Sequence, residues 1–519
     1  MREKLLSASV IDALSKRRAM LHLSLHFLSV RSTYRKTPTP NTDSSTSLTD
    51  VDTSTRLAAC THFSLRPPQP PPRPPMAGRG EVARRKSLRQ TIPKPRRKRT
   101  GLFFALRSAG TTFDGETMDD FDHRVLGNKL DLFHQQDESP GGIFWHPRGM
   151  VLYRVIEEYI RVRMRQAGFS EVRTPQILSR DLWERSGHWE KFGPNMFSLE
   201  SDRNPYCLKP MSCPCHVQIF KKGSRSYRDL PIRYCEFGAV HRAEPSGALH
   251  GLMRARAFTQ DDAHVLCLPD QIEDEVARFC KLLKAIYADF GFGECDVALS
   301  TRPPARAGDD AVWDRSEAML ASAARAAGLE FAILAGEGAF YGPKLEFHLV
   351  DRQGRKWQCG TIQLDFVLPE RLGASYVAED GAKATPVMLH HAVLGSLERF
   401  IGILLEHYEG WLPTWLAPDQ IVVANIGDDH RAFADRAASA FEDIGCRVLR
   451  DFRAERLPRK IFDATELAAP IVAIAGRKEA LAGEVSLRMR GGEQHVMTID
   501  AALAFLKQHA RVPSATRAC

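Results

Sequence analysis

The chain is 519 residues long, with 43% hydrophobic and 26% charged residues, which is enough to bury the cores of two or three domains. Its 72 basic and 63 acidic side chains give a formal net charge of +9, but residues 1–110 hold 22 of the basic and 6 of the acidic ones. The remainder is mildly acidic, which excludes a uniformly basic nucleic-acid-binding protein and leaves local patches for any such contact.

Neither a membrane span nor a disulfide framework is expected. No run of eighteen apolar residues occurs, so we expect a cytoplasmic protein with no membrane partner. The 11 cysteines are scattered without paired spacing, which favours reduced thiols. Residues such as Cys280 and Cys446 are expected to be small core side chains.

Residues 1–118 have the composition of an extension without a packed core. They contain a Thr/Ser-rich stretch at 42–55, a proline tract at 67–75 and a basic cluster at 96–99. Such a segment cannot bury enough apolar surface to offset the chain entropy lost on folding. We therefore expect residues 1–118 to be disordered.

The role of this extension has more than one interpretation. Its arginines and serines, with few acids, imitate an organellar transit peptide. It could equally be a nucleic-acid-binding arm, or follow from an upstream start codon. Met76 and Met118 are both plausible starts, and Met118 is favoured because globular patterning begins just after it.

Regular patterning begins at Gly142. Apolar residues recur at helical spacing from Leu152 to Val162, and Gly168 ends the pattern. Residues 171–175 then predict a strand that ends at a proline. This order alone is weak evidence, because a helix followed by a strand is common.

Four later runs predict an antiparallel sheet. Each is short and either alternating or wholly apolar, so one face of the sheet can present many polar groups. These runs are Ile232–Gly238, Ala257–His264, Lys344–Val350 and Lys356–Phe366.

The segment from Arg242 to His264 carries the densest functional signal. An arginine fork grips a phosphate at two points, and Arg254 can neutralise charge on the same phosphate. Phe258 can stack on a base, and Glu244 can accept hydrogen bonds from an exocyclic amine. This set suits a nucleoside triphosphate lying across two antiparallel strands, and the alternative is a polar hairpin with surface arginines.

Three distant residues are candidate metal ligands: Cys213, His264 and His390. One thiolate and two imidazoles make a zinc site with an open position, the form expected where a metal binds substrate. Their spacing excludes a zinc finger. From the residues alone nothing connects the three, and an unrelated core cysteine with two structural histidines is the favoured interpretation.

After Pro413 the chain alternates between strand-like and helical segments, which predicts a smaller α/β domain. The predicted domain covers residues 414–510, and residues 511–519 form a tail. Its predicted strands are Ile421–Asn425, Arg447–Leu449, Ile471–Ala475 and Glu484–Met489, with a helix near residues 430–444.

Together these features resemble the three motifs of class II aminoacyl-tRNA synthetases. The helix and proline-ended strand resemble motif 1, residues 242–264 resemble motif 2 in its threonyl-tRNA synthetase version, and residues 394–400 resemble motif 3. The resemblance covers about residues 119–508. It implies an α+β class II catalytic domain at 119–413, an antiparallel sheet flanked by helices, followed by an α/β anticodon-binding domain at 414–510.

The resemblance implies a homodimeric threonine–tRNA ligase that uses ATP with Mg²⁺, L-threonine and tRNA(Thr). Arg242 would contact the α-phosphate and Arg399 the γ-phosphate, and His188 matches a histidine implicated in transfer to tRNA. No general base is needed, because the attacking carboxylate is already ionised. The residues implied at ATP are Arg242, Glu244, Arg254, Phe258, Gln358 and Arg399, and those at threonine are Met211, Gln260, Asp262 and Tyr341.

The resemblance also implies that the three candidate ligands hold one zinc ion per subunit. The substrate's amino and hydroxyl groups would both coordinate it, so valine would be rejected. Two residues depart from the family: Cys215 stands where it usually has glycine, and His391 where it usually has arginine. Pro214 restricts this loop, so Cys213 stays the expected ligand.

In the C-terminal domain, Glu479 and Arg488 match family positions that read the anticodon. Ala454 stands where the family typically has asparagine, and Phe462 where a basic residue is common. The match therefore predicts anticodon contacts at the first two positions and changed contacts at the other two.

Bacterial-type relatives usually carry a ubiquitin-like domain and an editing domain ahead of the core. Residues 1–118 are too short and polar for both, so we expect a form without editing that charges serine slowly. His22 and His26 imitate an editing motif without a surrounding domain. Two alternatives are a paralogue that passes threonine to another acceptor and a regulatory or inhibitor-resistance protein, although the arginines at 242 and 399 argue against the latter.

Overall fold

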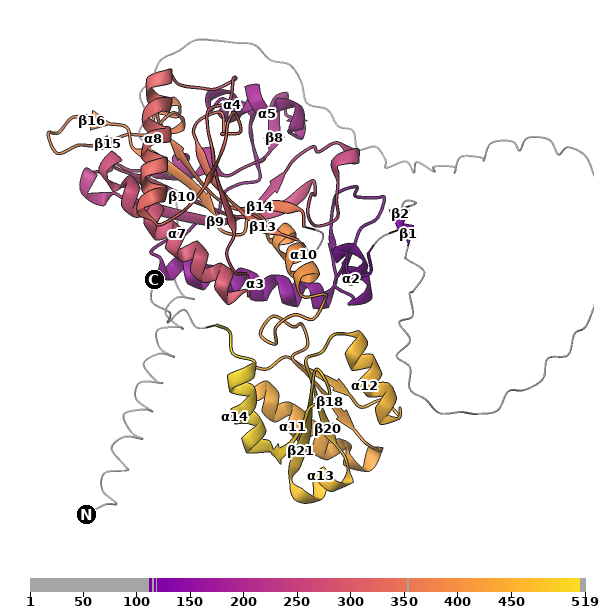
Figure 1. The fold of residues 1–519 in the computed structure, drawn as a ribbon. Coiled ribbons are helices and arrows are strands. Elements are labelled where there is room, and N and C mark those ends of the chain that lie inside the picture. Colours follow the sequence, from indigo (N-terminus) through magenta and orange to yellow (C-terminus); the bar gives the residue numbers. More distant parts are fainter. Residues whose placement is uncertain (1–111, 114–115, 118, 352–353, 514–519) are drawn as a thin grey trace, which may run out of the picture. The chain divides into compact units, whose positions relative to one another are not determined.

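The computed structural model describes residues 112–113, 116–117, 119–351 and 354–513 (Figure 1). Within the predicted extension it describes only the paired strands β1 (Thr112–Phe113) and β2 (Glu116–Thr117), so the prediction of disorder lies outside the described residues. Among the described helices, none combines the length and apolar character that a membrane span requires.

The larger part of the described chain is built on one eight-stranded sheet. All neighbouring strands are antiparallel except at the two edges, where β12 pairs with β11 and β5 with β9 in parallel. The strands, in spatial order, are β12 (Ala332–Leu334), β11 (Asp296–Ser300), β13 (Lys344–Val350), β14 (Lys356–Asp365), β17 (Val387–Ala392), β10 (Ala257–Cys267), β9 (Ile232–His241) and β5 (Ser170–Glu171).

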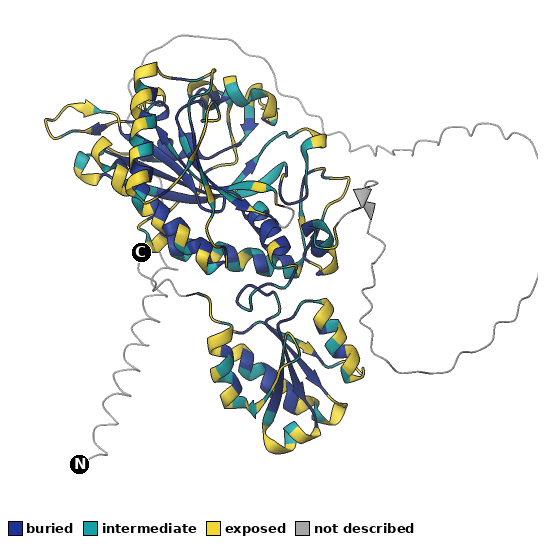
Figure 2. Ribbon diagram, in the orientation of Figure 1, coloured by how far each residue is buried: buried dark blue, intermediate teal, exposed yellow. Residues whose placement is uncertain are grey.

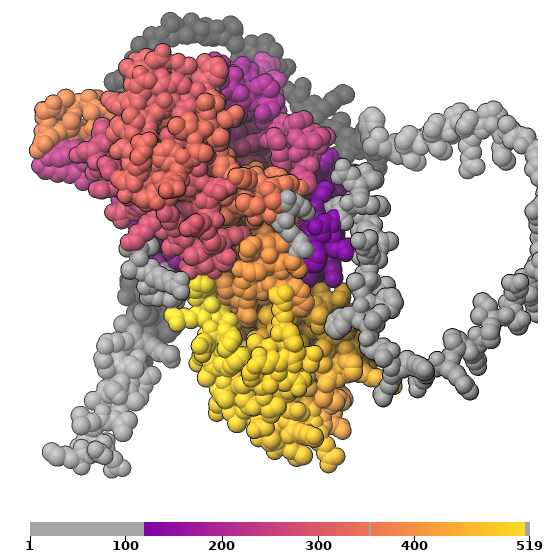
Figure 3. Space-filling model, viewed as in Figure 1, coloured from indigo at the N-terminus to yellow at the C-terminus, as the bar shows by residue number. Residues whose placement is uncertain are grey.

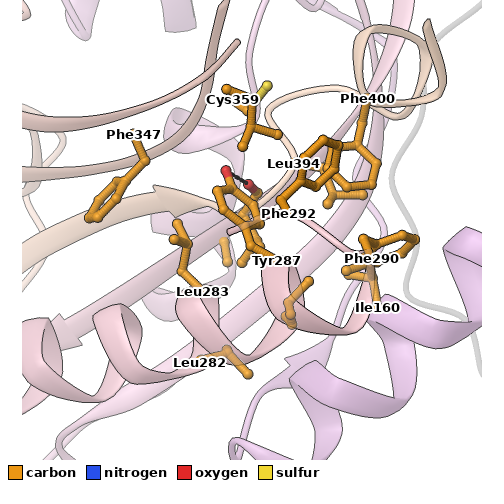
Figure 4. Packing of buried hydrophobic residues seen from close by; sticks show 14 of the residues in the cluster. Ile160, Leu282, Leu283, Tyr287, Phe290, Phe292, Phe347, Cys359, Leu394 and Phe400 are labelled. Atoms are coloured by element: carbon orange, nitrogen blue, oxygen red, sulfur yellow. Dashed lines mark hydrogen bonds between the residues drawn. The ribbon is translucent and has the colours of Figure 1, made fainter. Parts of the chain in front are cut away.

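One face of this sheet is apolar and lies in the hydrophobic core. Because strand side chains alternate between faces, Ala263 and Val265 of β10 enter this core while Asp262 and His264 face the other side. Figure 4 shows the packing, including Tyr287, whose hydroxyl donates to the backbone oxygen of Val393 at 2.9 Å. The helices that contribute to the core are α2 (His123–Lys129), α3 (Pro147–Gln166), α7 (Ile272–Asp289), α8 (Asp310–Ala326) and α10 (Leu397–His407).

Smaller elements complete this part. The salmon segment that includes α8 forms much of its near face in Figure 3. A three-stranded sheet has the order β6 (Ile177–Ser179), β8 (Asn204–Leu208) and β7 (Ser198–Ser201). The other elements are α4 (Arg180–Arg185), α5 (His188–Phe192), α6 (Cys213–Phe220), α9 (Leu368–Arg371) and the strand pairs β3 (Phe133–His134) with β4 (Phe144–Trp145) and β15 (Tyr376–Val377) with β16 (Lys383–Ala384).

The predicted helix and sheet are confirmed, whereas the strand predicted at 171–175 is too long. Proline at the first position opens α3, and Gly168 follows the helix with φ of +85°. Strand β5 ends at Glu171, and one further backbone bond to β9 follows, from the Val172 N–H to the Cys235 oxygen at 2.8 Å. The Thr174 N–H then donates to the side-chain carboxylate of Glu236 at 2.9 Å and not to a backbone oxygen.

The C-terminal part has the predicted α/β character, with a five-stranded sheet of which four strands were predicted. Strands β18 (Ile421–Asn425) and β20 (Ile471–Ala475) are buried throughout, whereas no residue of β22 (Gln494–Thr498) is buried, and the outer sides of the helices are exposed (Figure 2). Strand β22 and helix α14 were not predicted. In spatial order the strands are β19 (Val448–Asp451), β18 (Ile421–Asn425), β20 (Ile471–Ala475), β21 (Glu484–Met489) and β22 (Gln494–Thr498), and the helices are α11 (Arg431–Asp443), α12 (Leu457–Glu466), α13 (Arg477–Ala482) and α14 (Ile499–His509).

Candidate active site and metal centre

A cavity of about 580 Å³ opens over the polar face of the eight-stranded sheet. It is bordered by β10, β14 and β17, by the segment that follows β9, by the loop before β13 and by the first turn of α10. Every residue predicted at ATP, at threonine or at the metal lines this cavity. The sheet thus brings together side chains that are up to 188 positions apart in the sequence, from Met211 to Arg399.

The three candidate metal ligands meet at the inner end of the cavity. His264 of β10 and His390 of β17 are direct partners in the strand register, and Cys213 is the first residue of α6. Their ligand atoms lie within 4.8 Å of one another, and all three residues are buried. This distance is short enough for one ion to contact all three.

The hydrogen bonds leave one nitrogen of each histidine ready for a cation. His264 Nδ1 lies 2.8 Å from His216 Nδ1, and His216 Nε2 lies 3.2 Å from the Glu236 carboxylate. His390 Nε2 lies 2.8 Å from Asp365 Oδ2. Since a carboxylate accepts the proton in each chain, the lone pairs fall on His264 Nε2 and His390 Nδ1. Both atoms are buried without a partner among the described residues, so the group fits a metal ion.

Burial also tunes the protonation of this group. It lowers the pKa of His264 well below the ordinary value, with the neighbouring histidines adding to the effect, so the imidazole is neutral. Burial and the charge of Asp262 raise the pKa of the Cys213 thiol well above its ordinary value. The thiol therefore needs the positive charge of an ion to become a thiolate.

The two departures from the family pattern lie outside the metal group. Cys215 is buried beside Thr174 and Lys209. His391 faces the opposite side of the sheet, with its ring centroid 5.0 Å from Phe169 and 4.7 Å from Phe279. Neither belongs to the group of ligand atoms that includes Cys213.

Two half-buried arginines converge on the cavity. Arg242 follows β9, and its guanidinium lies 5.1 Å from the centroid of the Phe258 ring. Arg399 donates to the backbone oxygens of Met253 at 3.0 Å and Gln358 at 2.7 Å. Burial lowers the pKa of both arginines, and for Arg242 the charge of Arg399 contributes. Because an arginine stays charged, this pair is a strong site for an anion.

Glu244 and Arg254 form an ion pair across the mouth of the cavity. Arg254 Nη2 donates to Glu244 Oε2 at 2.8 Å, and Nε donates to the same oxygen at 3.1 Å. The side chain of Arg254 is 50% exposed, so it can turn toward a ligand at low cost.

Two buried carboxylates fasten β10 to the segment that carries Arg399. Asp261 accepts backbone N–H groups from Val393, Leu394 and Gly395 at 2.7 to 2.9 Å. Glu398 accepts the N–H of Thr259 at 2.9 Å. The segment that carries Arg399 is therefore fixed against β10.

The residues predicted to bind the substrate threonine surround the metal group. The Tyr341 ring stacks on the His390 ring at 4.8 Å, and its hydroxyl donates to Gln363 at 2.6 Å. Asp262 accepts the Ser212 N–H at 3.2 Å and is buried. Its carboxylate suits the ammonium group of an amino acid.

His188 lies behind the cavity wall and does not line the cavity. Its ring is 5.3 Å from that of Phe340 and 6.3 Å from that of Tyr341, both of which line the cavity. Nδ1 bonds Ser186 Oγ at 2.8 Å, and Nε2 is buried without a partner in the described chain. Burial lowers the pKa of His188 to about 3, with the charges of His390 and Arg371 adding to the shift.

The two predicted anticodon residues lie in the C-terminal part. Glu479 is on α13, where it accepts the Gly476 N–H at 3.0 Å, and Arg488 is on β21. Phe462 on α12 is 54% exposed, and Arg459 lies over its ring at 5.4 Å.

The residues that orient the metal ligands were not predicted from the sequence. His216 is three positions after Cys213 on one helix, a spacing that could have drawn attention to it. Asp365 and Glu236 gave no such signal, because only strand pairing brings them to their histidines. Lys209 also belongs here, with Nζ 3.1 Å from Glu236.

Comparisons with known proteins agree with this geometry. Residues 197–408 match the class II tRNA synthetase core domain of the G, H, P, S and T enzymes, and residues 420–509 match an anticodon binding domain. A threonine–tRNA ligase from Caulobacter sp. strain K31 is 56% identical over 398 residues, covering 76% of this chain and 60% of the relative.

Two further relatives give the same picture. A threonine–tRNA ligase from Methylococcus capsulatus is 56% identical over 374 residues, 72% of this chain and 59% of the relative. A crystal structure described as the RNA binding domain of threonyl-tRNA synthetase from Cryptosporidium parvum Iowa II is 40% identical, with a TM-score of 0.73, and covers 76% of this chain and 99% of that one. The chain thus spans about 60% of the length of the curated relatives.

Proposed function

The chain belongs to the threonyl-tRNA synthetase family of class II aminoacyl-tRNA synthetases, and on this premise we propose that it is a threonine–tRNA ligase. In the proposed reaction it joins L-threonine to ATP as threonyl-adenylate and then esterifies the 3′ end of tRNA(Thr). The observation that supports this most directly is one cavity that holds both a three-ligand metal group and two arginines.

The arginine pair is suited to the first step, the formation of threonyl-adenylate. The threonine carboxylate attacks the α-phosphorus of Mg²⁺-bound ATP, a new C–O–P linkage forms, and pyrophosphate leaves with the electrons of the broken P–O bond. Arg242 is proposed to hold the α-phosphate and Arg399 the γ-phosphate. Fixed charges in a partly desolvated cavity need no reorganisation as charge shifts, so they lower the barrier. Positioning supplies the rest.

The metal group is proposed to select the amino acid. Cys213, His264 and His390 would hold a zinc ion that supplies a Lewis-acid site for the amino and hydroxyl groups of threonine. Asp262 is placed to accept a hydrogen bond from the amino group that the zinc ion would bind, and Tyr341 packs on the His390 ring. Valine lacks the hydroxyl, so it would leave buried polar groups without a partner.

In the second step the terminal tRNA hydroxyl attacks the carbonyl carbon of the adenylate, the bond from that carbon to the phosphate oxygen breaks, and AMP leaves, its phosphate taking the proton of the hydroxyl. We propose that His188 assists this transfer from behind Phe340 and Tyr341. Its neutral ring has an unpartnered Nε2 that can accept a hydrogen bond.

Recognition of tRNA and assembly extend the proposal. Glu479 and Arg488 are proposed to contact the anticodon, and Phe462 offers an exposed ring on which a base can stack. A homodimer built through the α3 segment is proposed from the motif 1 resemblance. Analytical ultracentrifugation tests the dimer, with a single species of twice the chain mass as the expected result.

Two assays on the purified chain test the ligase proposal. ATP–pyrophosphate exchange with each amino acid identifies the one that is activated, and charging of total tRNA identifies the acceptor. Threonine-dependent exchange with threonine charged to tRNA is expected. Exchange without charging would favour a paralogue with another acceptor, and the lack of both reactions would reject an activating enzyme.

A further inference from the structure

A buried histidine beneath the nucleotide end of the cavity has no part in the proposed chemistry. His123 is the first residue of α2, and its side chain is fully buried. Its Nδ1 lies 2.7 Å from Glu406 Oε1, and the backbone N–H of Leu252 donates to its Nε2 at 3.1 Å. Since Leu252 provides a proton, Nε2 is the acceptor, and Nδ1 carries the hydrogen that Glu406 accepts.

The two partners of His123 belong to the two segments that carry the phosphate-binding arginines. Leu252 lies in the loop between β9 and β10, two positions before Arg254. Glu406 lies on α10, seven residues or about two turns after Arg399. His123 therefore joins the loop to the helix from a third element.

The loop is held from two sides at two peptide groups that are separated by one other. On one side the Leu252 N–H reaches His123, and on the other Arg399 Nε donates to the Met253 oxygen at 3.0 Å. Leu252, Met253 and Arg254 all line the cavity. A shift of the Leu252 peptide would therefore move both Arg254 and the backbone oxygen that orients Arg399.

The backbone beside His123 is shaped for this close contact. Gly251 has φ of +50°, and a Cβ at this position would lie 2.2 Å from His123 Nε2. Any larger residue would push the ring away from the loop. The His250 ring meets the His123 ring edge-on at 5.6 Å and stacks on Trp357 at 6.1 Å.

A second metal site is the alternative interpretation of this cluster. Ligand atoms of Asp122, His123 and His250 lie within 4.8 Å of one another. However, both ring nitrogens of His123 already have protein partners, and Asp122 accepts two hydrogen bonds from the Arg124 side chain at 3.0 Å. A metal ion would have to break these bonds, so the geometry favours a structural link.

We propose that His123 is a positioning residue that fixes the loop at Leu252–Arg254 against α10 and so aligns Arg254 and Arg399 for the triphosphate. The effect on ATP rests on the proposed function. The effect on the loop rests only on the hydrogen bonds described above.

The two ring nitrogens can be tested separately, because an asparagine amide reaches the place of Nδ1 and a glutamine amide that of Nε2. His123→Gln keeps an acceptor for the Leu252 N–H and loses the donor to Glu406. His123→Asn keeps the donor to Glu406 and loses the acceptor for the Leu252 N–H. Tyr408→Phe is the matched control. It removes one part-buried hydrogen bond just after α10, from the Tyr408 hydroxyl to the Phe290 oxygen at 2.8 Å.

Hydrogen exchange of peptides covering residues 248–256, without substrates, is the first readout. Faster exchange is expected in His123→Ala and His123→Asn, and exchange near that of the wild type in His123→Gln and Tyr408→Phe. Equal exchange in the glutamine and asparagine variants would overturn the proposal. Because no substrate is present, this result is independent of the ligase assignment.

The second readout is ATP–pyrophosphate exchange with ATP and threonine varied in turn. We expect His123→Asn to lower kcat/KM for ATP about 10- to 100-fold, as for a small misplacement of catalytic groups, with KM for threonine unchanged. His123→Gln should retain most of the activity. An equal loss of kcat/KM for ATP and for threonine would indicate general destabilisation. A second equivalent of metal that is bound by the wild type and absent in His123→Gln would indicate that His123 is a metal ligand. Either outcome overturns the proposal.

Discussion

His264 and His390 lie directly opposite each other on the neighbouring strands β10 and β17, and each ring keeps one buried nitrogen without a partner among the described residues. The other nitrogen of each ring is bound, by His216 in one case and Asp365 in the other. Leaving a buried polar atom unpaired is costly in a folded protein. A metal ion shared with Cys213 accounts for both atoms at once.

The first prediction concerns this metal group. Cys213→Ala and His264→Ala should each reduce zinc content and threonine activation together, because a ligand set of one thiolate and two imidazoles cannot lose a member and hold the ion tightly. Metal analysis and ATP–pyrophosphate exchange on the same preparation measure both. Cys215→Gly is the matched control and should leave both nearly unchanged. Full zinc and full exchange in Cys213→Ala would show that the ligands are misassigned.

The second prediction concerns the orientation of His390. Asp365→Asn should weaken zinc binding by about 10- to 100-fold, as is typical when the hydrogen-bond partner of a metal-bound histidine is changed. Competition with a chromogenic chelator measures the affinity. His391→Asn alters the neighbouring histidine, which faces the apolar side of the sheet, and should leave the affinity unchanged. If the two variants weaken binding equally, Asp365 has no specific role.

The third prediction concerns the triphosphate. Arg399→Ala should slow adenylate formation by two orders of magnitude or more, since losing one fixed electrostatic contact in a desolvated site costs about 3 kcal/mol. Single-turnover adenylate formation is the appropriate measurement. Arg399→Lys should recover part of the rate, because it restores the charge without the forked geometry. An alanine variant within threefold of the wild-type rate would remove Arg399 from the mechanism.

The fourth prediction separates the two chemical steps. His188→Ala should leave ATP–pyrophosphate exchange intact and slow the transfer of threonine to tRNA, because His188 lies behind Phe340 and does not line the nucleotide cavity. Rapid quench with preformed adenylate measures transfer alone. If both steps lose the same factor, the proposed role in transfer is wrong.

The fifth prediction uses a carboxylate remote from the metal group. Burial raises the pKa of Glu346, but hydrogen bonds from His348, Lys344 and Ser300 outweigh it and lower the pKa from 4.5 to about 2. The ionised group therefore stabilises the fold above pH 4.5, and this contribution is lost as the pH falls toward 2. Glu346→Gln should cost about 3 kcal/mol at pH 6 and about half of that at pH 3.

Urea denaturation at several pH values measures this difference. Glu330→Gln, at an exposed position, controls for the change in net charge. A Glu346→Gln penalty that does not shrink between pH 6 and pH 3 would contradict the low pKa.

Much of the fold could be predicted because its signals are local. Strands β13, β18, β20 and β21 have the bounds that were predicted. Their signals, an alternating or wholly apolar run between turn residues, lie in consecutive positions of the sequence. Strand β12 was missed because its three residues are all exposed and carry no alternation. The strand at 171–175 was predicted too long because a side chain, Glu236, takes the Thr174 N–H.

The candidate site, like the fold, has parts that could be predicted from the sequence and parts that could not. Cys213, His264 and His390 were connected only by family resemblance, since the register that pairs β10 with β17 is not visible in either segment alone. Residues that act on the ligands, such as Asp365, have no motif of their own. Whether a side chain such as His188 lines a cavity or lies behind its wall depends on packing between distant segments.

The most direct test of the account is the ratio of threonine to valine in tRNA charging, measured with wild-type chain and with Cys213→Ala. An apolar pocket alone distinguishes groups that differ by one methyl or hydroxyl by only about 10- to 200-fold. We expect the wild type to charge threonine and to exceed this ratio. The variant should lose threonine charging. Charging of valine by the wild type within about 200-fold of threonine, or unchanged threonine charging in Cys213→Ala, would contradict a ligase that selects threonine through this metal group.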